Sequence, residues 1–106
     1  MEPFRRTNNA VYRIVCSLCK DYDRRAREVR KGEKDAATLL HYVHLNDVID
    51  LSIASACEEG IRQQMREDIG NGVGYRRTQL YYIAEGTYKT RKRASIEAIA
   101  RNLHLI

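Results

Sequence analysis

Proline and long hydrophobic stretches are scarce in this sequence of 106 residues. Its one proline, Pro3, precedes every segment with a helical pattern, so the rest of the chain is free to form long helices. No stretch approaches the roughly 20 apolar residues that a membrane-spanning helix requires. Residues 1–9 are mostly polar and lack the apolar run of a secretory signal. We therefore expect a cytoplasmic protein that does not contact a membrane.

Cysteine is scarce too, and the odd number of three favours free thiols over a disulfide scaffold in a cytoplasmic chain. Cys16 and Cys19 are three residues apart, as are His41 and His44, and together they match the ligand types of a zinc site. Both pairs lie within helical patterns that leave no knuckle turn. No strand precedes Cys16, as one would in a redox Cys-x-x-Cys motif. We expect neither a bound metal nor a redox role.

Groupings typical of catalysis are also missing. The adjacent acidic pairs Glu58-Glu59 and Glu67-Asp68 point in different directions on a helix, as solvated side chains do. The glycine-rich stretch 71–74 lacks the lysine and the preceding strand of a phosphate-binding loop. We therefore expect a protein that is not an enzyme and holds no cofactor.

Charge is present in quantity but is unevenly distributed. Residues 1–31 contain nine Lys or Arg against four Asp or Glu, residues 32–70 three against eight, and residues 71–106 seven against two. The chain is thus basic at both ends and acidic in the middle. A basic segment of this kind is typical of a polyanion binder, and it is also compatible with a solvated surface that alternates in sign.

Apolar residues at helical spacing predict a first helix from Asn9 to Val29, capped by Thr7 or Asn8 and ended by Gly32. Its apolar stripe consists of Val11, Ile14, Val15, Leu18 and Tyr22. Its last turns carry cations that complement the negative end of the helix dipole, namely Arg24, Arg25, Arg27 and Arg30.

The middle of the chain predicts a short helix followed by a long one. Asp35 caps the short helix, and Asn46 caps the long helix, from Asp47 to Ile69. The pattern leaves open whether the two are continuous. The short helix contains Leu39, Leu40 and Val43, and the long one repeats apolar residues at intervals of four, at Ile49, Ile53, Cys57, Ile61 and Met65. A face left over on so long a helix would suit a second copy of the chain.

Glycines at 70, 72 and 74 predict a turn, after which residues 75–83 fit either a short helix or an extended stretch. Thr87 then caps a last helix that runs to about Asn102. Its apolar face contains Ile96, Ile99 and Leu103, with Tyr88 beside it.

The front half of this last helix is basic, whereas its rear half is apolar on one side. Such a division suits a helix whose front lies in the DNA major groove while its rear packs on the core. Cations near a helix N-terminus are mildly unfavourable, so folding does not explain them. Arginine pairs with guanine, and lysine and threonine reach phosphates. The candidate DNA-binding residues are Arg76, Arg77, Thr87, Lys89, Thr90, Arg91, Lys92 and Arg93.

The stretch from Gly86 to Ala100, followed by Leu103, resembles the C-terminus of phage-encoded transcriptional regulators of the ArpU/RinA type. Those proteins end in a Thr-Tyr or Thr-Phe pair, a basic cluster, an Ile-x-x-Ile-Ala and a closing Leu, and they are related to the last region of sigma factors. Residues 12–22, with Lys20-Asp21-Tyr22 and the arginines that follow, are similar to that family's opening helix. This chain departs from the pattern because residues 75–85 are short for the supporting helix of a helix-turn-helix.

These observations predict an all-α protein of three to five helices in a single domain, residues 1–106, with a helix-turn-helix-like DNA-binding part at residues 75–103. The resemblance implies a phage or prophage transcriptional regulator that binds a specific sequence of double-stranded DNA. RNA polymerase and a second copy of the chain are further candidate partners of such a regulator. The alternative is a helical interaction or assembly module that does not bind DNA.

Overall fold

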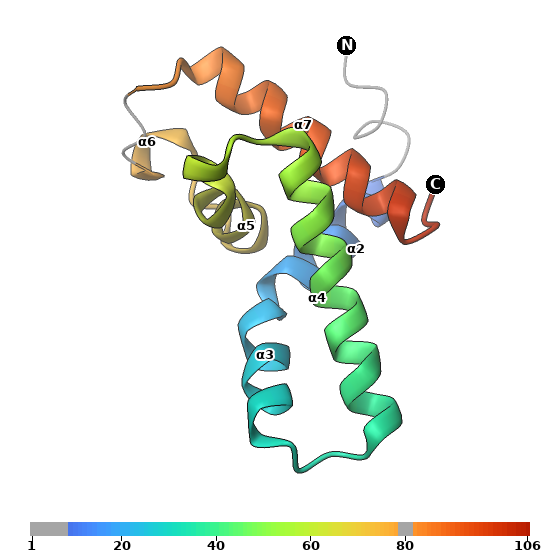
Figure 1. The fold of residues 1–106 in the computed structure, drawn as a ribbon. Helices are drawn as coiled ribbons and strands as arrows, with labels where there is room; N and C mark the ends of the chain where they lie inside the picture. The colour runs from blue at the N-terminus through green and yellow to red at the C-terminus, as the bar shows by residue number, and fades with distance from the viewer. Residues whose placement is uncertain (1–8, 79–81) are drawn as a thin grey trace.

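The computed structural model describes residues 9–78 and 82–106, and every regular element among them is helical. This confirms the all-α fold (Figure 1). The described residues form six α-helices and one short 3₁₀ turn, more elements than the three to five predicted. The number is higher because the first predicted helix is interrupted at Asp21 and because residues 75–78 form a helix of their own. The predicted caps Thr7 and Asn8 lie outside the described residues.

The first predicted helix is two helices, α2 (Asn9–Lys20) and α3 (Tyr22–Lys31). Asp21 interrupts them with φ −90° and ψ 2°, which turns the chain without breaking its hydrogen bonding, because the Asp21 N–H still donates to the Ser17 carbonyl at 3.1 Å. The Asp21 carboxylate accepts two bonds of 2.7 Å from Arg24. Gly32 ends α3 in the left-handed conformation, φ 67°, as predicted.

Arg25 lies in the interior, although its pattern placed it among the surface cations of the first helix. Its side chain is 2% exposed. The guanidinium Nε donates to Asn46 Oδ1 at 2.8 Å, and another of its nitrogens donates to the Leu18 carbonyl. Asp21, one turn earlier, also pairs with the guanidinium at 3.4 Å. Periodicity could not reveal the burial, because Asn46 lies 21 residues away in the sequence, on another helix.

The predicted short helix and the first part of the predicted long helix form one continuous helix, α4 (Ala36–Ala56). Its predicted N-cap is confirmed, since Asp35 accepts a hydrogen bond from the Thr38 backbone N–H. Asn46 is not a cap. It lies inside α4, where its side chain is buried, accepts from Arg25, and donates to the Tyr22 carbonyl at 3.2 Å.

The long predicted helix from Asp47 to Ile69 is interrupted at residues 57–61, although residues 62–69 are helical as predicted. The chain becomes extended at Cys57 and Glu58, passes through the 3₁₀ turn η1 (Glu59–Ile61), and continues as α5 (Arg62–Asn71). The predicted stripe is nevertheless buried in full, because the reversal brings the apolar residues of α4 and α5 into one core. Its members are Ile49, Ile53, Cys57, Ile61 and Met65.

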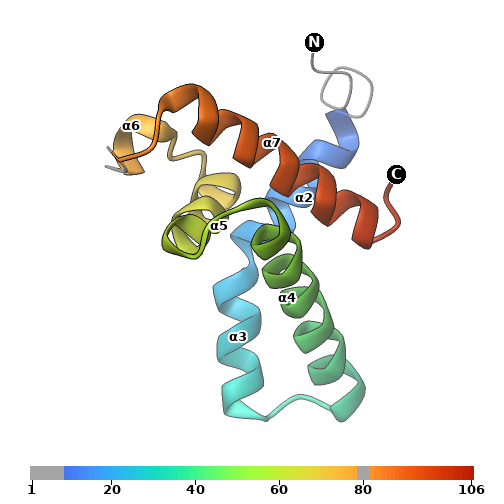
Figure 2. The same ribbon diagram turned by 45° about the horizontal axis from the view of Figure 1, so that its top comes forward.

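The remaining helices are the short α6 (Tyr75–Thr78) and the C-terminal α7 (Glu85–Asn102). In both views α3 and α4 form an antiparallel hairpin that projects from the body, while α7 crosses the C-terminal half of α4 and α5 lies to one side (Figures 1 and 2). Helix α2 packs mainly against α5 and also contacts α7. The core is therefore shared by α2, α4, α5 and α7, and the hairpin tip extends beyond it.

Candidate nucleic-acid interface

Helix α7 has one buried face and one exposed face over its basic front half. Tyr88 and Ser95 are buried, as are Ile96 and Ile99 farther along. Thr87 is exposed and does not cap the helix, which begins two residues earlier at Glu85 with Ala84 in the N-cap position. An acidic residue in the first turn favours this earlier start.

A buried carboxylate holds the front of α7 to the body. Asp68 of α5 is fully buried and accepts a hydrogen bond of 2.6 Å from the Tyr88 hydroxyl. It also accepts one of 3.0 Å from the Lys92 ammonium and one of 2.9 Å from the Gly74 backbone N–H. One side chain thus joins α5, the turn after it, and the basic half of α7.

The same contacts set the ionisation of this group. Burial opposes the charged form of Asp68, but the bonds from Tyr88, the Gly74 N–H and Lys92 outweigh it, so the pKa of Asp68 lies below its ordinary value. Burial and the hydrogen bond to Asp68 raise the pKa of the Tyr88 phenol. Asp68 is therefore a carboxylate and Tyr88 a neutral donor at neutral pH.

The rear of α7 is anchored to α4 by paired polar side chains. Cys57 Sγ and Ser95 Oγ lie 3.2 Å apart, and the Ser95 hydroxyl donates to the Arg91 carbonyl at 2.9 Å. Near the C-terminus Asn102 donates to Ser52 Oγ at 2.9 Å. Polar contacts thus join the front, the middle and the end of α7 to the body.

Six of the eight candidate DNA-binding residues are exposed. Lys89 pairs with Glu85 at 3.1 Å, and the Thr90 hydroxyl donates to the Gly86 carbonyl at 3.0 Å, so both contacts stay on the helix surface. Arg76 and Arg77 lie on α6, which the Tyr75 hydroxyl bonds to the Ile83 carbonyl near the start of α7. The exposed candidates are Arg76, Arg77, Thr87, Lys89, Thr90 and Arg93.

The other two candidates are held by internal partners. Arg91 Nε donates to Glu58 at 2.7 Å, across the junction between α4 and η1. Lys92 points inward to Asp68, with its side chain only 25% exposed. A pattern of consecutive cations could not separate these two from their neighbours, because their acidic partners lie 33 and 24 residues away in the sequence.

Asp68 and Tyr88 are the site residues that sequence reasoning missed. The acidic pair Glu67-Asp68 predicts a solvated Asp68, and the apolar spacing of the last helix predicts Tyr88 beside its apolar face, whereas the structure buries both side chains. Asp68 falls three residues after Met65 and one before Ile69, within the apolar repeat of α5, so its position at helical spacing was the available signal.

The Cys and His pairs are not brought together. His41 and His44 are exposed on α4, whereas Cys19 is buried on α2 beside Val15 in the core. Burial raises the pKa of the Cys19 thiol to about 12, so it is not a ready thiolate ligand or nucleophile. In the described part of the chain no group of three or more Cys, His, Asp or Glu side chains could hold a metal ion.

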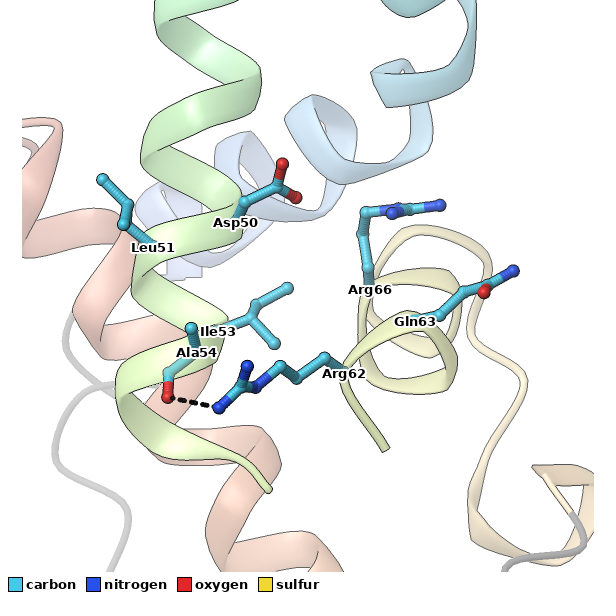
Figure 3. A pocket seen from close by; sticks show the side chains of 7 residues that line it. All are labelled: Asp50, Leu51, Ile53, Ala54, Arg62, Gln63 and Arg66. Atoms are coloured by element: carbon cyan, nitrogen blue, oxygen red, sulfur yellow. Dashed lines mark hydrogen bonds between the residues drawn. The ribbon is translucent and has the colours of Figure 1, made fainter. Parts of the chain in front are cut away.

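A pocket of about 320 Å³ lies between α4 and α5, apart from the basic face of α7 (Figure 3). Its two arginines already have partners. Arg62 donates to the Cys57 carbonyl at 3.0 Å, and Arg66 stacks over the Tyr22 ring at 3.9 Å. Asp50 on the opposite wall accepts from the Tyr22 hydroxyl at 2.9 Å. The charged side chains of this pocket are thus held by Tyr22 on α3 and by the backbone at the end of α4.

Comparison with known proteins identifies no relative, because no protein-family model, curated protein or solved structure matches this chain. Among residues 9–78 and 82–106 no helix is long and apolar enough to cross a membrane.

Proposed function

We propose that this protein binds double-stranded DNA through the exposed basic face of α7, and that it acts as a transcriptional regulator. The observation that carries the proposal is the pairing of this face with the buried Asp68 anchor behind it. Lys89 and Arg93 are exposed on this face, and clustered exposed cations attract a polyanion.

The residues proposed to contact DNA are the candidate cations that are exposed. Lys89 and Arg93 are one turn apart and exposed, and Arg76 and Arg77 on α6 add two more exposed cations near the start of α7. Lys92 serves instead to position the helix. The resemblance of residues 86–103 to ArpU/RinA-type regulators supports the same assignment.

The test replaces Lys89 and Arg93 together with alanine and measures affinity for a 30-bp duplex at several salt concentrations. At about 1–3 kcal/mol for each contact, the double variant should bind at least about thirtyfold more weakly. Its log–log salt slope should fall by about two units if both residues contact phosphate. Selection from random-sequence duplexes then measures whether one sequence is preferred.

The matched control replaces Arg27 and Arg30 with alanine. Both residues are exposed on α3, so this variant loses the same two positive charges from the projecting hairpin instead of from α7. Arg25 cannot serve, because it is buried. If the α7 variant and the α3 control lose affinity equally, the binding is non-specific attraction to a basic protein. A parent protein with no affinity for any duplex would favour the interaction-module alternative.

A further inference from the structure

Helix α4 carries apolar residues on two opposite faces, and the core covers only one of them. Ile49 and Ile53 on the inner face are buried at 0% and 2% exposure. Leu40 and Leu51 on the outer face are each 69% exposed, with Val43 beside them at 38%. Large apolar side chains that stay exposed on one helix face mark a candidate docking surface.

Among residues 9–78 and 82–106, the elements packed on α4, including α7 across its C-terminal half, leave Leu40 and Leu51 exposed. Tyr42 and Asn46 face α3, through contacts with Arg24 and with Arg25. In the close view Leu51 points away from α5, whereas Asp50 extends toward it (Figure 3). Along the projecting half of α4, both ribbon views show α3 on one side and no other element of the body (Figures 1 and 2).

The residues of the outer face are separated by the same intervals in either direction along the helix. They are Leu40, His44, Asp47 and Leu51, separated by four, three and four positions. At 100° per residue they lie within about 60° of one another around the helix. Two leucines therefore stand at the ends of the face, with a histidine and an aspartate between them, all four exposed.

We propose that this outer face of α4 docks on the same face of a second copy of the chain, with the two helices antiparallel. In that register Leu40 meets the second copy's Leu51, and His44 meets its Asp47, twice each by symmetry. A parallel register would instead oppose Asp47 to Asp47, which like-charge repulsion disfavours. An unrelated partner would not require the palindromic spacing. The proposal does not depend on DNA binding.

Cysteine cross-linking tests the register directly. Leu40 and Leu51 lie 11 residues apart, about 16 Å along one helix, which is too far for a disulfide within the chain. Leu40→Cys alone and Leu51→Cys alone should give no more covalent dimer on mild oxidation than the parent with its native cysteines. An equimolar mixture of the two should give the mixed dimer in high yield. Equal cross-linking of each variant with itself would overturn the antiparallel register.

A charge exchange tests the same contact in solution. His44→Asp opposes two carboxylates, and the dimer dissociation constant from analytical ultracentrifugation should rise by about tenfold or more. Adding Asp47→His again places one histidine against one aspartate, so the double variant should recover dimerisation although each position still differs from the parent. A double variant that dimerises as weakly as His44→Asp would refute the pairing of His44 with Asp47. A parent that stays monomeric at several hundred micromolar would refute self-docking, whether the face then meets solvent or another protein.

Discussion

A single glycine decides how closely two helices of the body approach each other. Gly70 was expected in a turn, but it lies inside α5, where it faces the end of α2. A Cβ at this position would lie 2.8 Å from the Lys20 backbone nitrogen and 2.9 Å from its Cα. Because the obstacle is main chain, no side-chain rotation could relieve the overlap.

Replacing Gly70 with alanine should therefore lower the free energy of unfolding by about 1–3 kcal/mol, as overpacking does, despite the better helix propensity of alanine. Urea unfolding followed by circular dichroism measures the change. The matched control is Gly86→Ala in α7, where an added Cβ meets nothing within 4 Å. That variant should be neutral or more stable by up to about 1 kcal/mol. If the two variants had equal stability, the close approach of α2 and α5 would be wrong.

At the scale of the element, a buried ion pair joins the front of α7 to α5, in addition to the apolar contacts of the inner face of α7. Asp68 accepts from Tyr88, Lys92 and the Gly74 backbone, so it bonds both the helix and the turn that leads toward it. Removing one partner of a buried pair leaves the other charge poorly solvated. The ion pair between Lys89 and Glu85 on the exposed face of the same helix has no such consequence.

Asp68→Asn should accordingly cost about 3 kcal/mol of unfolding free energy at neutral pH, since Lys92 loses its counter-charge. The pKa of Asp68 is lowered in the folded state, so its contribution is present above the unfolded value of about 3.9 and is lost as pH falls through the folded value. Stability measured by urea unfolding between pH 5 and pH 2 should therefore fall less steeply in the variant than in the parent.

Glu85→Gln is the isosteric control for this experiment, because it removes a carboxylate from a pair that is largely exposed on both sides. It should change stability by less than about 1 kcal/mol. A similar loss in both variants would mean that helix charge, and not the buried contact, holds α7 in place.

At the scale of the whole molecule, the two proposed surfaces lie on different elements. The basic face belongs to α6 and the front of α7, and the outer face of α4 runs along the projecting hairpin. The core of α2, α4, α5 and α7 lies between them, so a surface substitution in one should leave the other folded.

The two surfaces should therefore be separable by mutation. The Lys89 and Arg93 double alanine variant should sediment as a dimer like the parent, while Leu51→Glu should sediment as a monomer. The monomeric variant should keep the salt slope per protomer on a duplex too short for two copies, because each copy retains its phosphate contacts. If Leu51→Glu abolished that residual binding while the protein stayed folded, the two surfaces would not be independent.

The features that the sequence determined by itself are those set by local chemistry and by periodicity. Gly32 ends a helix because its left-handed conformation suits a residue without a side chain, and Asp35 begins one because its carboxylate accepts a backbone N–H. Apolar residues at helical spacing identified most of the core, including the whole repeat of residues 49–65. The all-α class and the basic front of the last helix follow from the same reasoning.

The tertiary structure alone decided where the chain turns and which polar residues are buried. The bend at Asp21 and the reversal at Cys57 and Glu58 leave the apolar repeat in register, so periodicity does not reveal them. Arg25 becomes interior because the packing of α3 on α4 brings Asn46, 21 residues away in the sequence, to its guanidinium. Lys92 turns inward because the packing of α7 on α5 brings Asp68, 24 residues away, to its ammonium. A buried charge is tolerated only when its partners are in place, and the packing of whole helices brings Asn46 to Arg25 and Asp68 to Lys92.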